Sequence, residues 1–192
     1  MSVELEKTKE LAREIDKALS DTQLQKIDKE MIPSLFFSTA IEHHRSILLL
    51  VENRLYGSSS SLLRCLFESY VKGLWFSKCA DEAAFEKLRK DKFEKPFGVL
   101  VKEIEGVDPK GLQKAKKNHW SVLNSLTHSG LHQLSRRVTE ENITSNYDQP
   151  FIEDMVKMAS TYGFLSCAEV AIISKNEKTL ESVYNISQKY GL

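Results

Sequence analysis

Long stretches of this sequence contain neither glycine nor proline, and this scarcity of helix-breaking residues narrows the possible folds more than any other feature. There are eight glycines and four prolines in 192 residues. Within the uninterrupted stretches, apolar residues recur at helical spacing, as they do in helices that bury one face. We therefore predict an all-α protein, a single-domain helical bundle of roughly five to seven helices around one core.

A long antiparallel helix hairpin over residues 33–80 is expected at the centre of this bundle. Its first helix is predicted to begin near Pro33, because proline suits the first turn of a helix. Gly57 is expected to end that helix, because glycine accepts the left-handed conformation that follows many helices. The second helix, over residues 60–79, is apolar on nearly all sides, which is typical of a helix enclosed by others.

Two peripheral helices are predicted in residues 1–32, before the hairpin. The first, over residues 2–19, has a thin apolar stripe, and Ser2 is in a position to cap it. The second is a short helix over residues 22–31. The polar character of the first helix indicates that it covers the bundle from outside.

Residues 81–118 are predicted to form a charged crossover of short helices. Between residues 87 and 117 there are ten Lys or Arg against five Asp or Glu, and prolines and glycines divide the segment. Residues 119–192 then supply the remaining bundle helices. Asp148 is predicted to cap the first of the last two helices, and Asn176 is predicted to start the second.

Charge, hydropathy and cysteine content predict a cytoplasmic protein with no membrane partner. The formal net charge is zero, so no general attraction to nucleic acid or anionic lipid is expected. The N-terminal residues lack the basic start and apolar run of a signal peptide. The longest nearly apolar run, Tyr162–Ile173, contains Glu169 and is shorter than the roughly 20 residues of a membrane span. The three cysteines, Cys65, Cys79 and Cys167, are expected to be buried free thiols.

Several classes of active site have no support in the sequence. It contains no GxGxxG, Walker A, HExxH, GxSxG or EF-hand pattern. The Glu-x-x-His pairs of di-iron carboxylate bundles are also missing. We therefore expect neither a metal nor a cofactor.

The first candidate site is the set Arg64, Glu68 and Lys72, which forms the only polar stripe of the apolar second hairpin helix. Residues four apart lie on one helix face, so these three side chains are neighbours. One interpretation is a solvent-exposed ladder of salt bridges, which contributes little stability. The other is a half-buried charge cluster facing a cleft, where burying charge is costly unless it serves binding or catalysis.

Histidines supply the other candidate ligand-binding residues. His44 lies within the apolar stripe of the first hairpin helix and is predicted to face the core, either as a structural histidine or as a proton carrier or ligand. His128 and His132 are four residues apart and would share a face if the helix continued, with Ser125 and Arg136 nearby. That face is either solvated or part of a polar binding site.

A third pattern combines positive charge with an aromatic residue. Lys114, Lys116 and Lys117 lie close to Trp120 in the sequence. Such clusters bind RNA in some proteins, and in many others they form a solvated helix face. RNA is therefore one candidate partner.

Two stretches of the sequence together resemble uncharacterised bacterial all-helical families. The first, from Ile41 to Trp75, contains Leu63-Arg64-Cys65-Leu66-Phe67-Glu68, an LR-x-x-FE pattern. The second, from Trp120 to Arg137, is centred on Leu126-Thr127-His128-Ser129-Gly130, a THxG pattern. These families are similar to the HEPN group of helical bundles. Some HEPN members cleave RNA in toxin and phage-defence systems, and members are often dimers. This sequence lacks the arginine followed shortly by histidine that HEPN nucleases carry.

The resemblance implies a site formed by Arg64, Glu68 and His128, with Ser125 nearby. Our main functional hypothesis is a binding or interaction module with a polar cleft for a partner protein or a small ligand. The alternative is a HEPN-like, toxin-type ribonuclease, in which His128 acts as general acid or base and Arg64 stabilises the transition state. A homodimer is also expected, because the long hairpin offers more apolar surface than one core requires.

Overall fold

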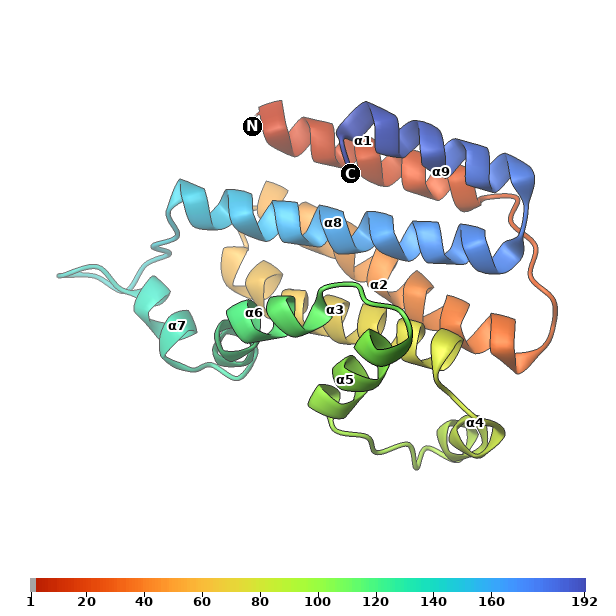
Figure 1. The fold of residues 1–192 in the computed structure, drawn as a ribbon. Helices are drawn as coiled ribbons and strands as arrows, with labels where there is room; N and C mark the ends of the chain where they lie inside the picture. Colours follow the sequence, from red (N-terminus) through yellow and green to blue (C-terminus); the bar gives the residue numbers. More distant parts are fainter. Residues whose placement is uncertain (1–2) are drawn as a thin grey trace.

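Two long antiparallel helices, α2 (Asp28–Glu52) and α3 (Tyr56–Lys78), lie side by side at the centre of the computed structural model, which describes residues 3–192 (Figure 1). A third long helix, α8 (Gln149–Ser174), packs against both of them. The largest fully buried side chains of the core come mainly from these helices. The predicted central hairpin is therefore confirmed, and α8 completes the core around it.

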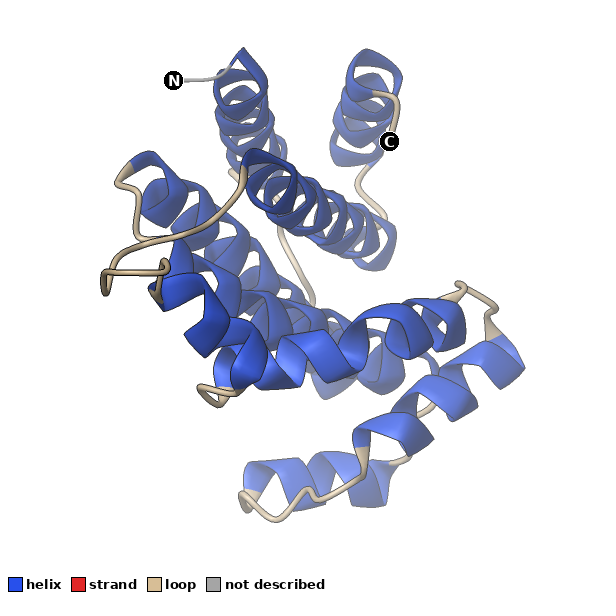
Figure 2. Cartoon of the chain, turned by 90° about the vertical axis from the view of Figure 1, so that its left-hand side faces the viewer, coloured by secondary structure: helices blue, strands red, loops and turns tan. Residues whose placement is uncertain are grey.

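Shorter helices cover this core on two sides. They are α1 (Val3–Leu19), α4 (Glu82–Arg89), α5 (Phe97–Val107), α6 (Leu112–Thr127), α7 (Leu131–Leu134) and α9 (Glu177–Tyr190). Helices α1 and α9 pack on each other and on α8, so that both ends of the described chain lie on one side of the molecule (Figure 2). Helices α5 and α6 pack on α3. The all-α, single-domain prediction is confirmed, although residues 3–192 form nine α-helices rather than roughly five to seven.

The start of the hairpin differs from the prediction. Helix α2 begins at Asp28, and Pro33 lies in its second turn, where its missing N–H removes one backbone hydrogen bond near the helix start. The short helix predicted over residues 22–31 is therefore wrong, because the chain before Asp28 is a non-helical connection. The predicted helix over residues 2–19 corresponds to α1, and Ser2 lies outside the described residues.

The turn of the hairpin also differs from the prediction. Arg54, with φ of 59°, adopts the left-handed conformation that was expected of Gly57. Gly57 lies in the first turn of α3, at a close contact with the segment after α6. A Cβ atom at this position would lie 3.0 Å from Nε2 of Gln133 and 3.2 Å from the hydroxyl of Tyr147. Gly57 therefore allows the segment after α6 to approach α3 closely.

The predicted helix starts in the C-terminal half are correct. The Asp148 carboxylate accepts a hydrogen bond of 2.8 Å from the Phe151 N–H at the start of α8. The Asn176 side chain accepts one of 3.1 Å from the Thr179 N–H at the start of α9. In both cases the side chain satisfies a backbone donor that has no partner within the helix.

Replacing Asp148 with alanine is expected to lower the free energy of unfolding by about 1 kcal/mol, because the first turn of α8 loses its cap. Urea denaturation followed by circular dichroism measures this loss. Asp148→Asn is the matched control, because asparagine caps helices nearly as well as aspartate. Equal losses in the two variants would contradict a capping role.

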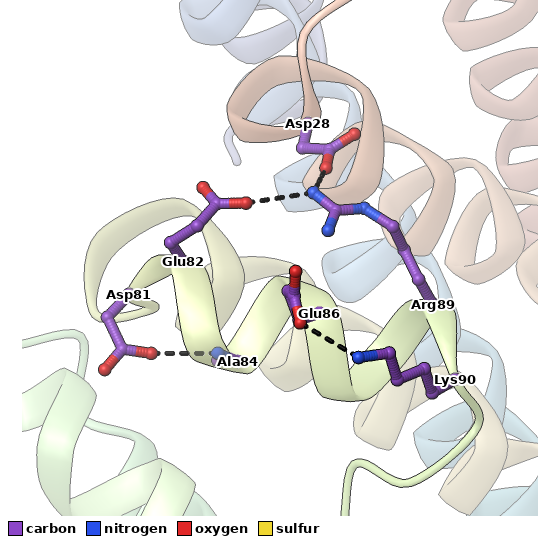
Figure 3. Close-up of polar contacts among 7 residues, drawn as sticks. All are labelled: Asp28, Asp81, Glu82, Ala84, Glu86, Arg89 and Lys90. Atoms are coloured by element: carbon purple, nitrogen blue, oxygen red, sulfur yellow. Dashed lines mark hydrogen bonds and ion pairs between the residues drawn. The ribbon is translucent and has the colours of Figure 1, made fainter.

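The charged crossover is attached to the bundle by ion pairs at both of its ends. Near its start, Arg89 of α4 contacts Asp28 at the beginning of α2 and also pairs with Glu82, as Figure 3 shows. Near its end, the Lys110 ammonium lies 3.1 Å from Glu169 Oε1 of α8. Glu169 is only 3% exposed, and Lys78 lies 3.9 Å from its other oxygen, so two lysines compensate the charge of this buried carboxylate.

Helix α8 is the one helix in residues 3–192 whose length and composition would suffice to cross a membrane. Its 26 residues exceed the apolar run recognised in the sequence. However, 56% of its most apolar window is buried inside the protein, as in the central helix of any bundle. Length and composition alone are therefore weak evidence for a membrane span.

The three cysteines are free thiols, and they differ in exposure. Cys167 is buried, as predicted, and burial raises its pKa to about 12. Cys65 and Cys79 are partly exposed, so the prediction that all three are buried is wrong. Cys65 lies in the middle of α3, and Cys79 is the residue that follows its last turn.

Candidate functional site

Arg64 is the centre of the candidate site. Its Nε donates a hydrogen bond of 2.8 Å to Oε1 of Glu68, one turn later on α3. The two side chains are 21% and 26% exposed, so the pair is half-buried. The Arg64 guanidinium also lies over the indole of Trp120 on α6, 5.1 Å from the ring centroid. These contacts hold the guanidinium in one orientation at the surface between α3 and α6.

His128 joins this pair from another helix. It is the C-terminal cap residue of α6, and its Nε2 contacts Nη1 of Arg64. Because arginine only donates hydrogen bonds, Nε2 must accept and Nδ1 must carry the proton. The end of α6 is held against α3 by the Ser61 hydroxyl, which donates to the Leu126 carbonyl at 2.9 Å, and by the Thr127 hydroxyl, which donates to the Ser61 carbonyl at 3.1 Å. The structure thus brings together the three residues implied by the family resemblance.

An aromatic column supports Arg64 from the core. Trp120 is stacked on Phe97 of α5, with ring centroids 4.0 Å apart and planes 4° apart. Phe97 in turn meets the edge of Phe67, which is fully buried in α3. The position of the guanidinium therefore depends on packing in the core as well as on its own helix.

The Arg64–Glu68–His128 cluster is open to solvent rather than enclosed. His128 is exposed. A groove of about 550 Å³ lies between α6 and α8, and it is lined by Leu63 and Leu126, neighbours of the cluster residues, together with other mainly apolar side chains. Lys72, the third residue of the polar stripe, pairs with no carboxylate in the part of the chain that the structure describes. The stripe is therefore one half-buried ion pair joined by a histidine, and not a ladder of salt bridges.

Ser125, His132 and Arg136 hold the segment after α6 in place. The Ser125 hydroxyl accepts a hydrogen bond of 3.0 Å from the His132 backbone N–H. Arg136 donates to the His132 carbonyl at 2.7 Å, and its guanidinium lies over the Phe151 ring, 4.2 Å from the centroid. These contacts attach α7 and the residues that follow it to α6 and α8. The His132 side chain takes no part in them and is exposed.

The arrangement in which His128 and His132 share a helix face does not occur. Helix α6 ends at Thr127, and Ser129 adopts a left-handed conformation with φ of 55°. Gly130 has a negative φ and is needed for its size, because a Cβ atom there would lie 2.5 Å from Oγ of Ser125. The two histidines therefore lie on either side of a turn.

His44 lies in the core, as its position in the apolar stripe predicted. Its side chain is 0% exposed and packs between α2 and α8, where Nε2 lies 3.5 Å from Oγ of Ser160. A Cβ atom at Gly163 would lie 2.4 Å from Nδ1, so glycine is required beside the imidazole. Burial, and secondarily the charge of Arg45, lowers the pKa of His44 to about 4. His44 is therefore a neutral histidine of the interior.

Trp120, the aromatic residue of the predicted RNA-binding pattern, is covered on its ring by other side chains of the protein. The Trp120 ring is stacked on Phe97 and lies under the Arg64 guanidinium, so it is not a free platform for a base in this conformation. The role of Trp120 in positioning Arg64 was not predicted. The available signal was spacing, because Trp120 and Thr127 are seven residues apart and therefore lie on the same face of α6, the one that meets α3. Within residues 3–192, no group of three or more His, Cys, Asp or Glu side chains is arranged to hold a metal ion.

Comparison with known protein families gives a match over residues 37–191, which cover most of the chain and include the whole Arg64–Glu68–His128 cluster. No curated protein and no solved structure matches the chain. The match extends beyond the stretches that carry the resemblance and includes α8 and α9. The chain belongs to a family of unknown function, DUF6988.

Proposed function

We propose that this protein is a binding module that holds a carboxylate or phosphate group of its ligand at Arg64. The proposal depends on one observation: a half-buried arginine on α3 is fixed by Glu68 and Trp120, and its outer edge contacts an exposed histidine from α6. A guanidinium that is already oriented loses little conformational freedom when a ligand binds.

The contact with His128 indicates where the ligand would bind. The imidazole accepts a hydrogen bond from Nη1 of Arg64 as a neutral group. A carboxylate or phosphate oxygen is a better acceptor for a guanidinium, because the hydrogen bond is then charge-assisted on both sides. An incoming anion therefore replaces His128 at this edge of Arg64, while Glu68 keeps its own bond to Nε.

Isothermal titration with citrate and with inorganic phosphate tests the proposal. Saturable binding is expected, and Arg64→Gln is expected to weaken it about tenfold or more, the effect of losing one charge-assisted contact. His128→Ala is expected to keep or strengthen binding, because it removes the competing acceptor. Arg13→Gln, at an exposed position on α1, is the matched control.

Two results would overturn this proposal. One is the absence of saturable heat for either anion up to about 10 mM, a concentration that reveals even millimolar affinity. The other is an equal loss of binding in Arg64→Gln and Arg13→Gln, which would mean that the anions bind through general charge and not at the cluster.

RNA cleavage is the second candidate, and the exposed His128 beside Arg64 is the observation that favours it, because acid–base catalysis next to a cation suits phosphodiester cleavage. The two functions differ in what they predict for His128→Ala. A ribonuclease would lose cleavage of tRNA in that variant, whereas the binding module keeps its ligand. We favour binding because Nε2 of His128 is engaged by Arg64 and the Trp120 ring is covered.

A further inference from the structure

A separate cavity of about 630 Å³ lies where the end of α3, helix α4, the segment after α4, and α5 meet. Its volume is within the range of small-molecule binding sites. Four lysines line it, together with three acidic residues and a largely aromatic floor. The lysines are Lys78, Lys87, Lys92 and Lys95.

Two of the four lysines are already paired within the protein. Lys95 lies 2.9 Å from a carboxylate oxygen of Glu103, and Lys78 lies 3.8 Å from Asp108. The carboxylate of Asp81, which also lines the cavity, accepts a hydrogen bond of 2.9 Å from the Ala84 N–H at the start of α4. These charges stabilise the walls of the cavity and are not free for a ligand.

Lys87 and Lys92 are the two lysines left over. Within the described chain, no carboxylate lies within 4.0 Å of either ammonium group. Glu94, another acidic residue of the wall, likewise has no lysine or arginine within 4.0 Å of its carboxylate. The lining groups without an ion-pair partner are therefore Lys87, Lys92, Glu94 and Asp81, and of these only the Asp81 carboxylate is engaged by a backbone N–H. The Lys92 N–H donates a hydrogen bond of 2.8 Å to the Lys87 carbonyl, in a turn that Asp91 makes with φ of 53°. This turn keeps the two lysines on one wall of the cavity.

The apolar part of the cavity is formed by Trp75 and Phe93, whose ring centroids are 5.2 Å apart. The Trp75 Nε1–H donates a hydrogen bond of 2.5 Å to Oε2 of Glu103, so the indole is fixed in orientation. The Lys95 ammonium lies over the same ring, 4.6 Å from its centroid. Because Trp75 is only 4% exposed and Lys95 covers its ring, a flat apolar group of a ligand would meet mainly the partly exposed Phe93 ring that packs on it.

Helix α4, the outer wall of the cavity, is anchored to the bundle. Its Phe85 is fully buried and packs on Phe76 of α3, with ring centroids 5.4 Å apart. On another face of α4, Arg89 contacts Asp28 of α2 (Figure 3). The cavity is thus bounded by elements that are fixed before any ligand arrives, as in most small-molecule sites.

We propose that this cavity binds a small organic anion, with its phosphate or carboxylate group at Lys87 and Lys92 and its flat apolar body against Phe93, close to the buried Trp75. The site shares no residue with the Arg64–Glu68–His128 cluster. It is therefore a second binding site, and it does not depend on the function proposed for the first.

Fluorescence of Trp75 tests this proposal directly. The chain has two tryptophans, so Trp120→Phe leaves Trp75 as the only one. Adenosine monophosphate and benzoate carry an anionic group on a flat body, and inorganic phosphate lacks the body. We expect saturable changes in Trp75 emission with the first two probes, and much weaker binding of inorganic phosphate.

Variants separate this cavity from general charge effects. Replacing Lys87 and Lys92 together with glutamine is expected to weaken binding of the two organic anions by about tenfold or more, because charge-assisted contacts are lost. Arginine at both positions is expected to keep binding, which shows that the fold is intact. Glutamine at Lys114 and Lys117 of α6 is the matched control, and Arg64→Gln is expected to have no effect.

Three results would overturn the proposal. They are no saturable change with either organic anion, an equal loss of binding in the control pair on α6, and binding of inorganic phosphate as tight as that of adenosine monophosphate. The last result would mean that the aromatic wall contributes nothing to recognition.

Discussion

Replacing Phe67 with alanine is expected to lower the free energy of unfolding by about 3–5 kcal/mol, the usual cost of truncating a fully buried phenylalanine. The Phe67 side chain is 0% exposed on α3. Its ring lies 5.4 Å from that of Phe97 on α5 and 4.9 Å from that of Tyr162 on α8. One side chain thus connects three helices, so its removal leaves a cavity that no single helix can close. Urea denaturation followed by circular dichroism measures the loss.

The same substitution is expected to affect the candidate site, because Phe97 supports Trp120 and Trp120 lies under Arg64. Anion binding at Arg64 should therefore weaken in Phe67→Ala even under conditions where the variant is folded. Phe36→Ala is the matched control, because Phe36 is only partly buried and stacks on Phe76 at the other side of the hairpin. If both variants lost the same stability and kept the same binding, the aromatic column would not be what positions Arg64.

The parts of the fold that could be predicted from the sequence depend on local interactions. The caps at Asp148 and Asn176 are examples, because a cap requires only a side chain and the backbone three residues later. The enclosed position of α3 followed from its apolar surface, since a helix that is apolar on nearly all sides must be covered. The charged crossover could likewise be predicted, from its many charged residues and from the prolines and glycines that divide it.

The roles of individual glycines could not be predicted, because they depend on what packs against them. Gly57 was expected to make the hairpin turn, yet Arg54 makes it, and Gly57 lies at a close contact with Gln133 and Tyr147. Gly73 is a similar case, since a Cβ atom there would lie 2.6 Å from the Phe37 ring on α2. Only the packing of α2 on α3 reveals this requirement. A glycine in a sequence therefore indicates either a turn or a contact, and neighbours distant in sequence decide which.

The candidate site shows the same division. The contact of Arg64 with Glu68 follows from their spacing on one helix. Helical spacing left open whether His128 is solvated or part of a polar site, and it could not show that this exposed residue meets α3. That contact depends on the packing of α6 on α3 through Ser61 and on the stacking of Trp120. The resemblance to other helical families, and not periodicity, placed His128 beside Arg64.

Lowering the pH from 7 to 4.5 is expected to destabilise the protein by about 2–3 kcal/mol through His44 alone. Its pKa is about 4 in the folded protein, against an ordinary value of 6.5. Below pH 6.5 the unfolded chain binds a proton at this side chain, whereas the folded protein excludes it until about pH 4. The stability that depends on neutral His44 is therefore fully present above pH 6.5, and it is lost progressively as the pH falls toward 4.

The physical cause is the position of the imidazole between α2 and α8. Its side chain is 0% exposed, and Gly163 lies against one side of the ring. Within residues 3–192, its Nδ1 has no hydrogen-bond partner, so a proton bound there would be both desolvated and unpaired. The neighbouring charge of Arg45 opposes protonation further. At low pH, protonation of His44 thus favours states in which α8 no longer covers α2.

Urea denaturation at pH 7, 5.5 and 4.5 checks this prediction when the wild type is compared with His44→Gln. Glutamine does not titrate, so the variant should lose less stability over the same range, by about 2–3 kcal/mol. His119→Gln is the matched control, because His119 is exposed on α6 and its replacement should leave the pH dependence unchanged. Parallel pH profiles for the wild type and His44→Gln would contradict the prediction. They would mean that the carboxylates, which also protonate in this range, account for the acid sensitivity, and that His44 gains a proton without disturbing the packing of α2 on α8.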